Sequence, residues 1–132
     1  MPATEELPQL FAAAWNAHDM ERFAGLFDDR ARFVNVFGTY WQGREEIRAA
    51  HEATHATVFS RSTLSIDRTD RTDLSDGCST QYVHWTLDGL YGPDGGAMAP
   101  RTGILLLVSR RDGKGDSLIV AAQNTDKVSG PN

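Results

Sequence analysis

The sequence contains a single cysteine, Cys78, no excess of positive charge and no long hydrophobic run. One cysteine excludes an internal disulfide and is typical of proteins in a reducing cytoplasm. Thirteen Lys and Arg residues against eighteen Asp and Glu residues give a formal net charge of −5. This charge argues against a nucleic-acid partner, because nucleic acids are bound by basic surfaces. The apolar runs, such as residues 104–108, are far shorter than the roughly 20 residues of a membrane-spanning helix, so we expect no membrane partner.

Residues 1–6 have neither the basic flank nor the apolar stretch of a signal peptide, and we expect none. The length of 132 residues predicts one domain that spans residues 1–132. A chain of this size buries roughly two thirds of the surface that its unfolded form exposes. The sequence therefore predicts a small, acidic, cytoplasmic domain with one core and room for one pocket.

Helical periodicity dominates the first part of the chain and strand periodicity the second. Apolar residues recur at three-to-four spacing over residues 7–15, Asp19 is placed to cap a short second helix, and a third helix is predicted over residues 44–59. Strands are predicted over residues 31–37, 63–70, 80–88, 102–110 and 117–126. Helices gathered before an antiparallel meander indicate an α+β fold, in which three N-terminal helices pack on one face of a curved, mainly antiparallel sheet.

The strand predicted over residues 102–110 is apolar on both faces. Ile104, Leu106 and Val108 alternate with Leu105 and Leu107, whereas a strand with one face in water alternates apolar with polar residues. The second apolar face therefore needs another surface to cover it. We expect a homodimer formed through the sheet, because a symmetric pair of copies covers such a face most simply.

Residues 51–55 have the sequence His-Glu-Ala-Thr-His, which matches the His-Glu-x-x-His motif of zinc hydrolases. On a helix, His51 and His55 lie on one face, where they can bind Zn²⁺ while Glu52 acts as a general base. A catalytic zinc needs a third protein ligand, but no Glu follows Glu52, and nothing in the spacing selects His84 or an Asp. We therefore expect no metal and a helix that faces a core or pocket; a zinc-dependent hydrolase remains a second alternative.

The order of the elements and several short motifs resemble one known family. These motifs are Trp15 to Asp19, Phe27 to Ala31, Gly38, Gly43 to Ile47 and Asn124 to Asp126. With them the chain resembles the nuclear-transport-factor-2-like, or SnoaL-like, superfamily, and more narrowly the SgcJ/EcaC group, some members of which belong to enediyne and other polyketide pathways. It implies a cone-shaped fold whose open end leads to an apolar pocket between helices and sheet, and dimerisation through the sheet.

The resemblance does not name a reaction, because this fold hosts isomerases, cyclases, dehydratases and binding proteins. No Gly-rich nucleotide-binding motif follows a strand, so we expect no cofactor. Relatives similar to ketosteroid isomerase carry a carboxylate base three residues before a glycine, where this chain has Asn35 before Gly38. Relatives similar to the cyclase SnoaL carry a carboxylate late in the sheet, near Asn124. Asn cannot remove a proton, which weakens both mechanisms here.

The histidines are the best candidates for acid–base chemistry, because their pKa lies near neutrality. His51 lies within the apolar stripe of its helix, His55 lies at the edge of that stripe, and His84 lies on a predicted strand. His84 shares one face of its strand with Tyr82, and the sequence does not say which face lines the pocket. His18 precedes a helix cap and is expected at the surface.

The expected ligand-binding residues comprise pocket walls and hydrogen-bonding groups. Aromatic side chains suit a flat or polyene-like ligand, Asn inside apolar strands needs a hydrogen-bond partner, and an Arg beside the glycine-rich loop can meet an acidic group. These residues are Trp15, Tyr40, Trp41, Tyr82, Asn35, Asn124 and Arg101. The sequence thus predicts a protein that binds or transforms a polyketide-like intermediate by cofactor-free acid–base chemistry; a non-catalytic carrier is the alternative.

Overall fold

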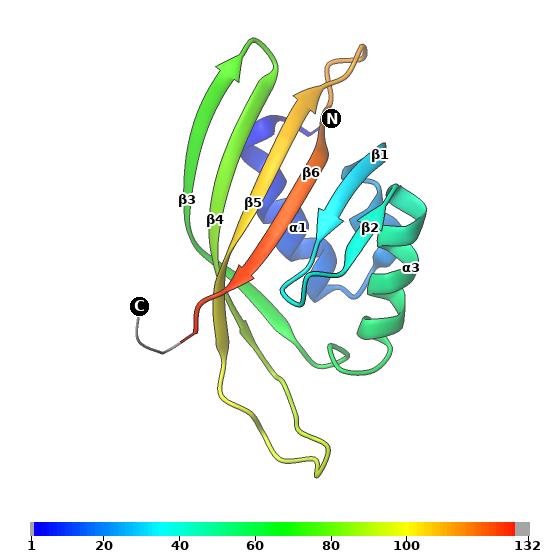
Figure 1. Ribbon diagram of the computed structural model, residues 1–132, viewed down its shortest axis with the longest axis vertical. Coiled ribbons are helices and arrows are strands. Elements are labelled where there is room, and N and C mark those ends of the chain that lie inside the picture. Colours follow the sequence, from blue (N-terminus) through cyan, green and yellow to red (C-terminus); the bar gives the residue numbers. More distant parts are fainter. Residues whose placement is uncertain (1, 129–132) are drawn as a thin grey trace.

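The computed structural model describes residues 2–128 and has the predicted α+β architecture, with helices on one face of a curved sheet (Figure 1). The strands β3 to β6 bend as they cross in front of α1 (Figure 1). The elements in chain order are the 3₁₀ turn η1 (Thr4–Glu6), α1 (Leu7–Asn16), α2 (Met20–Ala24), β1 (Phe27–Val34), β2 (Tyr40–Gln42), α3 (Arg44–His55), β3 (Thr63–Ser75), β4 (Cys78–Asp88), β5 (Arg101–Arg111) and β6 (Ser117–Asp126).

The six strands form one sheet in the order β2-β1-β6-β5-β4-β3. Only the contact between β1 and β6 is parallel, and all other neighbours are antiparallel. We call the face that the helices cover the inner face and the opposite one the outer face. Burial alternates along β4, where Val83, Trp85 and Leu87 are buried on the inner face. This alternation settles which side of the strand lines the interior.

The helices pack on the sheet through an aromatic core. Phe11 of α1 lies edge-on to Phe23 of α2, with 4.8 Å between ring centroids. Phe23 in turn contacts Phe27 at the start of β1, at 5.4 Å. The α2 helix begins as predicted, since the Asp19 side chain accepts a hydrogen bond from the Arg22 backbone N–H at 3.1 Å.

The strand predicted over residues 31–37 is wrong at both ends. The observed β1 begins at Phe27 and ends at Val34, and the short β2 follows it and pairs back onto it. The Asn35 side-chain oxygen accepts hydrogen bonds from the backbone N–H groups of Phe37 and Thr39, at 3.0 and 2.8 Å. These bonds close a turn in place of the extra strand residues.

The third helix is also shorter than predicted. It ends at His55 and not at residue 59, because the Phe59 backbone N–H turns back to the Thr54 carbonyl at 2.8 Å. Val58, which lies inside the predicted helical range, is outside the observed helix and is 61% exposed. Within residues 2–128, no helix has both the length and the apolar character needed to cross a bilayer.

Candidate functional site

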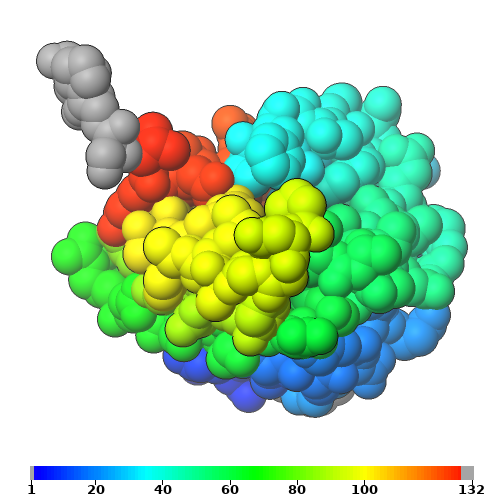
Figure 2. All heavy atoms as spheres, turned by 90° about the horizontal axis from the view of Figure 1, so that it is seen from below, coloured from blue at the N-terminus to red at the C-terminus, as the bar shows by residue number. Residues whose placement is uncertain are grey.

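A cavity of about 210 Å³ lies between the inner face of the sheet and the helices α1 and α3. It opens toward the end of the molecule where the β4–β5 connection (yellow), the β1–β2 region (cyan) and the segment after α3 (green) come together (Figure 2). Its walls are mainly apolar and include the aromatic side chains of Phe11, Trp15, Phe33, Trp41, Phe59 and Trp85. Large flat rings on several sides favour a flat, largely apolar ligand.

All three tryptophans of the chain line this cavity. The Trp15 indole N–H donates a hydrogen bond to the Ser62 hydroxyl at 2.9 Å, and the Trp85 indole N–H donates to the Asn124 side-chain oxygen at 2.8 Å. These bonds fix two of the three rings, so two walls of the cavity are already formed without a ligand.

His51 lines the cavity from α3. Its Nδ1 lies 2.8 Å from the Ile47 carbonyl, and a carbonyl only accepts, so Nδ1 carries the proton and Nε2 carries the lone pair. The ring packs among Phe23, Phe33 and Trp41 and is 6% exposed. Burial lowers the pKa of His51 to about 4. At neutral pH His51 is therefore an uncharged ring whose Nε2 accepts a hydrogen bond.

Asn124 presents a hydrogen-bond donor to the cavity. Because the Trp85 N–H can only donate, the bonded atom of Asn124 is its oxygen, and the amide Nδ2 is left over. The Trp85 ring reaches Asn124 across Gly103, where an added Cβ would stand 2.2 Å from the ring. A glycine inside an apolar strand often marks such a close approach, and Gly103 is therefore the sequence signal for this contact.

Asn35 has the same arrangement and lies beside Asn124, because the preceding residues Val34 and Gln123 pair across β1 and β6. Its oxygen accepts the two N–H groups of the β1–β2 turn, which leaves its Nδ2 without a protein partner among the described residues. The two asparagines therefore each offer an N–H₂ group at the cavity, one from the β1–β2 turn and one from β6.

Arg101 lines the cavity at the start of β5 and is paired with Asp126 at the end of β6. Its Nη2 lies 2.8 and 2.9 Å from the two carboxylate oxygens, and both side chains are about three-quarters buried. The pair offsets the positive charge. The Nε and Nη1 groups of Arg101 form no hydrogen bond within residues 2–128. Asp126 was not singled out by the sequence analysis, because nothing in a strand-end Asp signals its partner.

The structure thus brings six of the expected site residues to one cavity, namely Trp15, Asn35, Trp41, His51, Arg101 and Asn124. Among residues 2–128, no carboxylate lines it. Its polar side chains are the N–H donors Asn35, Asn124 and Arg101, the neutral acceptor His51 Nε2, and Thr54, whose hydroxyl donates to carbonyls of its own helix. Chemically, the site can hold an apolar ligand that carries oxygen acceptors at one end and a hydroxyl or N–H donor at the other.

His84, Tyr82 and Tyr40 do not line this cavity, which corrects the expectation for these three. His84 and Tyr82 alternate with buried Val83 and Trp85, so they point to the outer face, where His84 Nε2 lies 3.2 Å from Asp70. Tyr40 is 52% exposed, because β2 turns the neighbouring Trp41 inward and Tyr40 outward.

His55 is buried but lies outside the cavity lining, against Trp15 at 4.4 Å between ring centroids. Its Nδ1 lies 2.8 Å from Nδ1 of His18, which was expected to be an ordinary surface residue. One ring of such a pair must donate and the other accept, so a single proton lies between them. Burial first, and then the neighbouring His18 and His51, lower the pKa of His55 to about 4.

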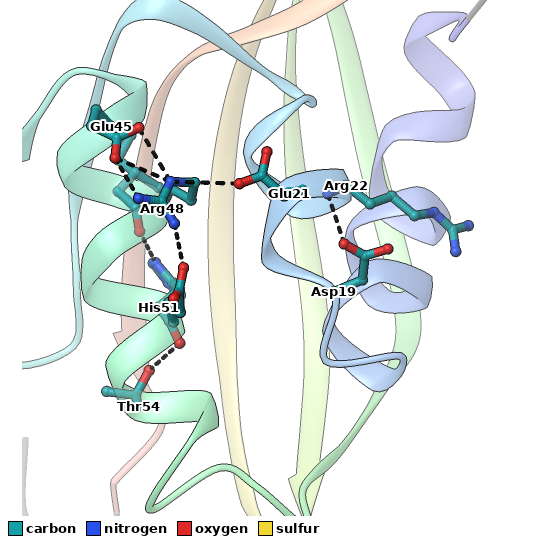
Figure 3. Close-up of polar contacts among 9 residues, drawn as sticks. Asp19, Glu21, Arg22, Glu45, Arg48, His51 and Thr54 are labelled. Atoms are coloured by element: carbon teal, nitrogen blue, oxygen red, sulfur yellow. Dashed lines mark hydrogen bonds and ion pairs between the residues drawn. The ribbon is translucent and has the colours of Figure 1, made fainter.

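The His-Glu-x-x-His segment does not assemble a zinc centre. Glu52 does not line the cavity and pairs with Arg48. Arg48 also pairs with Glu45 and with Glu21 of α2 (Figure 3). Across the part of the chain that the structure describes, no three His, Cys, Asp or Glu side chains come close enough to bind one metal ion. From this motif the cavity receives His51 and Thr54.

A second hollow, of about 520 Å³, lies at the other end of the sheet. Its charged groups pair with one another: Arg71 contacts Glu5 and Asp73, and Arg111 contacts Asp76. It is larger than the aromatic cavity but open and polar, and its cations are already neutralised. We therefore take the aromatic cavity as the candidate site.

Comparison with known proteins agrees with this geometry. The SnoaL-like domain family matches residues 9–115, and the chain therefore belongs to this family. The comparison with curated proteins finds no match.

Solved structures share the fold over nearly the whole chain. An uncharacterised protein with a cystatin-like fold from Caulobacter vibrioides is 28% identical, with a TM-score of 0.86 over 96% of this chain and 88% of that one. A nuclear-transport-factor-2-like protein from Salmonella enterica is 17% identical, with a TM-score of 0.80 over 98% and 96%. A ketosteroid isomerase-like protein from Erwinia carotovora atroseptica is 14% identical, with a TM-score of 0.76 over 95% and 94%. These likenesses confirm the predicted cone fold.

Proposed function

We propose that this domain binds a flat, uncharged, mainly apolar small molecule that carries carbonyl or hydroxyl oxygens. The observation that carries this proposal is the set of polar side chains in the cavity lining: Asn35, Asn124 and Arg101 keep N–H donors, and His51 Nε2 is a neutral acceptor. Buried polar groups need partners, so the ligand that fits supplies oxygen acceptors to the donors and a hydroxyl or N–H to His51.

A polyketide-like intermediate has this chemistry, because it combines a flat carbon skeleton with several carbonyl and hydroxyl oxygens. Membership in the SnoaL-like family and the resemblance to the SgcJ/EcaC group support this ligand class. An enediyne precursor is one member of the class. The cavity volume of about 210 Å³ and its aromatic side chains suit a bicyclic or tricyclic ligand better than a long flexible one.

Binding without turnover is favoured by the state of His51. A base with a pKa of about 4 takes up a proton weakly at neutral pH, and the cavity holds no carboxylate to replace it. If the protein is an enzyme, His51 Nε2 moves the proton and the Asn35 and Asn124 amides stabilise the developing oxyanion. Multiple turnover by the purified protein without added cofactor would show that the protein is an enzyme and not a carrier.

Filling the cavity is expected to abolish ligand binding. Thr54 lines the cavity from α3, so Thr54→Phe places a ring in the ligand volume, and the affinity for 2-acetylnaphthalene, a flat neutral ketone, should fall at least about tenfold. Isothermal titration calorimetry measures this change.

Thr57→Phe is the matched control. Thr57 also bonds its hydroxyl to the carbonyl four residues earlier, as Thr54 does, but it is exposed and lies outside the cavity. Its affinity should equal that of the unchanged protein. Equal affinities for Thr54→Phe and Thr57→Phe would show that the ketone binds elsewhere and would reject the proposal.

We propose that two copies associate through the outer face of the sheet. Ile104, Leu106 and Val108 lie side by side on that face, and the neighbouring Tyr82 is 49% exposed. Sedimentation equilibrium at micromolar concentration should give twice the mass of 14.5 kDa, and Leu106→Asp should give the single mass. A monomeric mass for the unchanged protein would contradict the dimer.

A further inference from the structure

We propose that Asp126 makes the cavity selective for uncharged ligands. By neutralising Arg101, it favours binding of a neutral carbonyl compound over a carboxylate of the same shape. This inference rests on the proposed function, because it concerns the same cavity. It assigns Asp126, which does not line the cavity, the role of a specificity-determining residue.

The geometry makes Asp126 the counter-ion of the cavity's single cationic side chain. Both carboxylate oxygens lie within 2.9 Å of Arg101 Nη2. The two side chains are 27% and 26% exposed, so solvent screens the pair only in part. No Asp or Glu lines the cavity, and without Asp126 the charge of Arg101 would face the ligand alone.

The strand register places Asp126 next to the cavity-lining Asn124. Asp126 is the cross-strand partner of Gly103 on β5, and Asn124, two residues earlier on β6, is the partner of Leu105. Side chains two residues apart share a face of a strand, so Asp126 stands on the inner face next to the donor Asn124. The sheet therefore places the carboxylate beside both Arg101 and the donor Asn124.

The two ligand types meet this end of the cavity differently. A neutral carbonyl oxygen accepts hydrogen bonds from the remaining N–H groups of Arg101 and from Asn124 Nδ2 without disturbing the ion pair. A carboxylate either lies close to Asp126, where like charges repel, or displaces Asp126 and leaves it partly buried without its partner. Both arrangements cost free energy, so the neutral ligand is preferred.

The test compares two ligands of one shape, 2-acetylnaphthalene and 2-naphthoate, by isothermal titration calorimetry at pH 7. The unchanged protein should bind the ketone about tenfold more tightly than the carboxylate. Asp126→Asn removes the counter-ion and should raise the affinity for 2-naphthoate about tenfold. The double variant Arg101→Gln with Asp126→Asn should lose this gain, since the uncompensated guanidinium is its source.

Asp76→Asn is the matched control, because Asp76 also pairs with an arginine, Arg111 at 2.7 Å, but at the far end of the sheet. It should leave the preference for the ketone unchanged, and circular dichroism confirms that each variant is folded. Ketone binding with no gain for 2-naphthoate in Asp126→Asn would overturn the inference alone. Absence of binding of both ligands to every variant would overturn the proposed function, and the inference with it.

Discussion

Gly103→Ala is expected to lower the free energy of unfolding by about 3 kcal/mol, although Ala normally stabilises a strand relative to Gly. An added Cβ would lie 2.2 Å from Cζ2 of Trp85 and 2.4 Å from the backbone oxygen of Thr125. The ring can rotate away only by breaking its bond to Asn124, and the backbone oxygen belongs to the β5–β6 pairing. The substitution therefore damages the sheet and one wall of the cavity together.

Gly113→Ala is the control for this substitution. Gly113 lies in the turn between β5 and β6, and an added Cβ there meets nothing within 4 Å. Urea unfolding followed by circular dichroism should give a loss for Gly103→Ala and almost no change for Gly113→Ala. Equal midpoints for the two variants would show that Trp85 does not lie across Gly103 as described.

The second large effect is a loss of stability in mild acid. Burial lowers the pKa of His51 in the folded protein to about 4, against its ordinary value of 6.5. The unfolded chain therefore binds this proton at a pH where the folded protein does not, and stability is complete above pH 6.5 and lost as the pH falls toward 4. The shift corresponds to about 3 kcal/mol for His51, and His55 acts in the same direction.

The contribution of His51 is isolated by comparing variants across this pH range. His51→Leu removes the group, so its free energy of unfolding should fall less between pH 7 and pH 4 than that of the unchanged protein, by about 3 kcal/mol. His84→Gln removes a histidine on the outer face and should keep the steep fall. A pH profile unaffected by His51→Leu would contradict the buried, neutral state of His51.

The fold was predictable because its long elements have clear periodicity. The four strands β3 to β6 are each ten residues or longer, burial alternates along most of β4 and β5, and the order of the strands after the helices defines the class. The short β2 was missed because three residues carry no periodic signal, and the turn that forms it depends on how Asn35 bonds its own neighbours.

The site was predictable only where a residue's direction follows from its own element. His51 points inward because it lies on the apolar stripe of α3, and the sequence shows that stripe. His84 and Trp85 are neighbours on β4, and successive side chains of a strand point to opposite faces. Trp85 therefore points to the cavity and His84 to the outer face. The pairs His18–His55 and Arg101–Asp126 join distant segments, so no local pattern reveals them.

The central claim is that the aromatic cavity is the ligand site, and a two-dimensional ¹H–¹⁵N NMR titration with 2-acetylnaphthalene tests it most directly. The three indole N–H signals belong to Trp15, Trp41 and Trp85, which all line the cavity. We expect these signals to shift and saturate together at one equivalent, while amides around Arg71 and Arg111 in the polar hollow stay unchanged. Shifts confined to that hollow, with unmoved indole signals, would contradict the account.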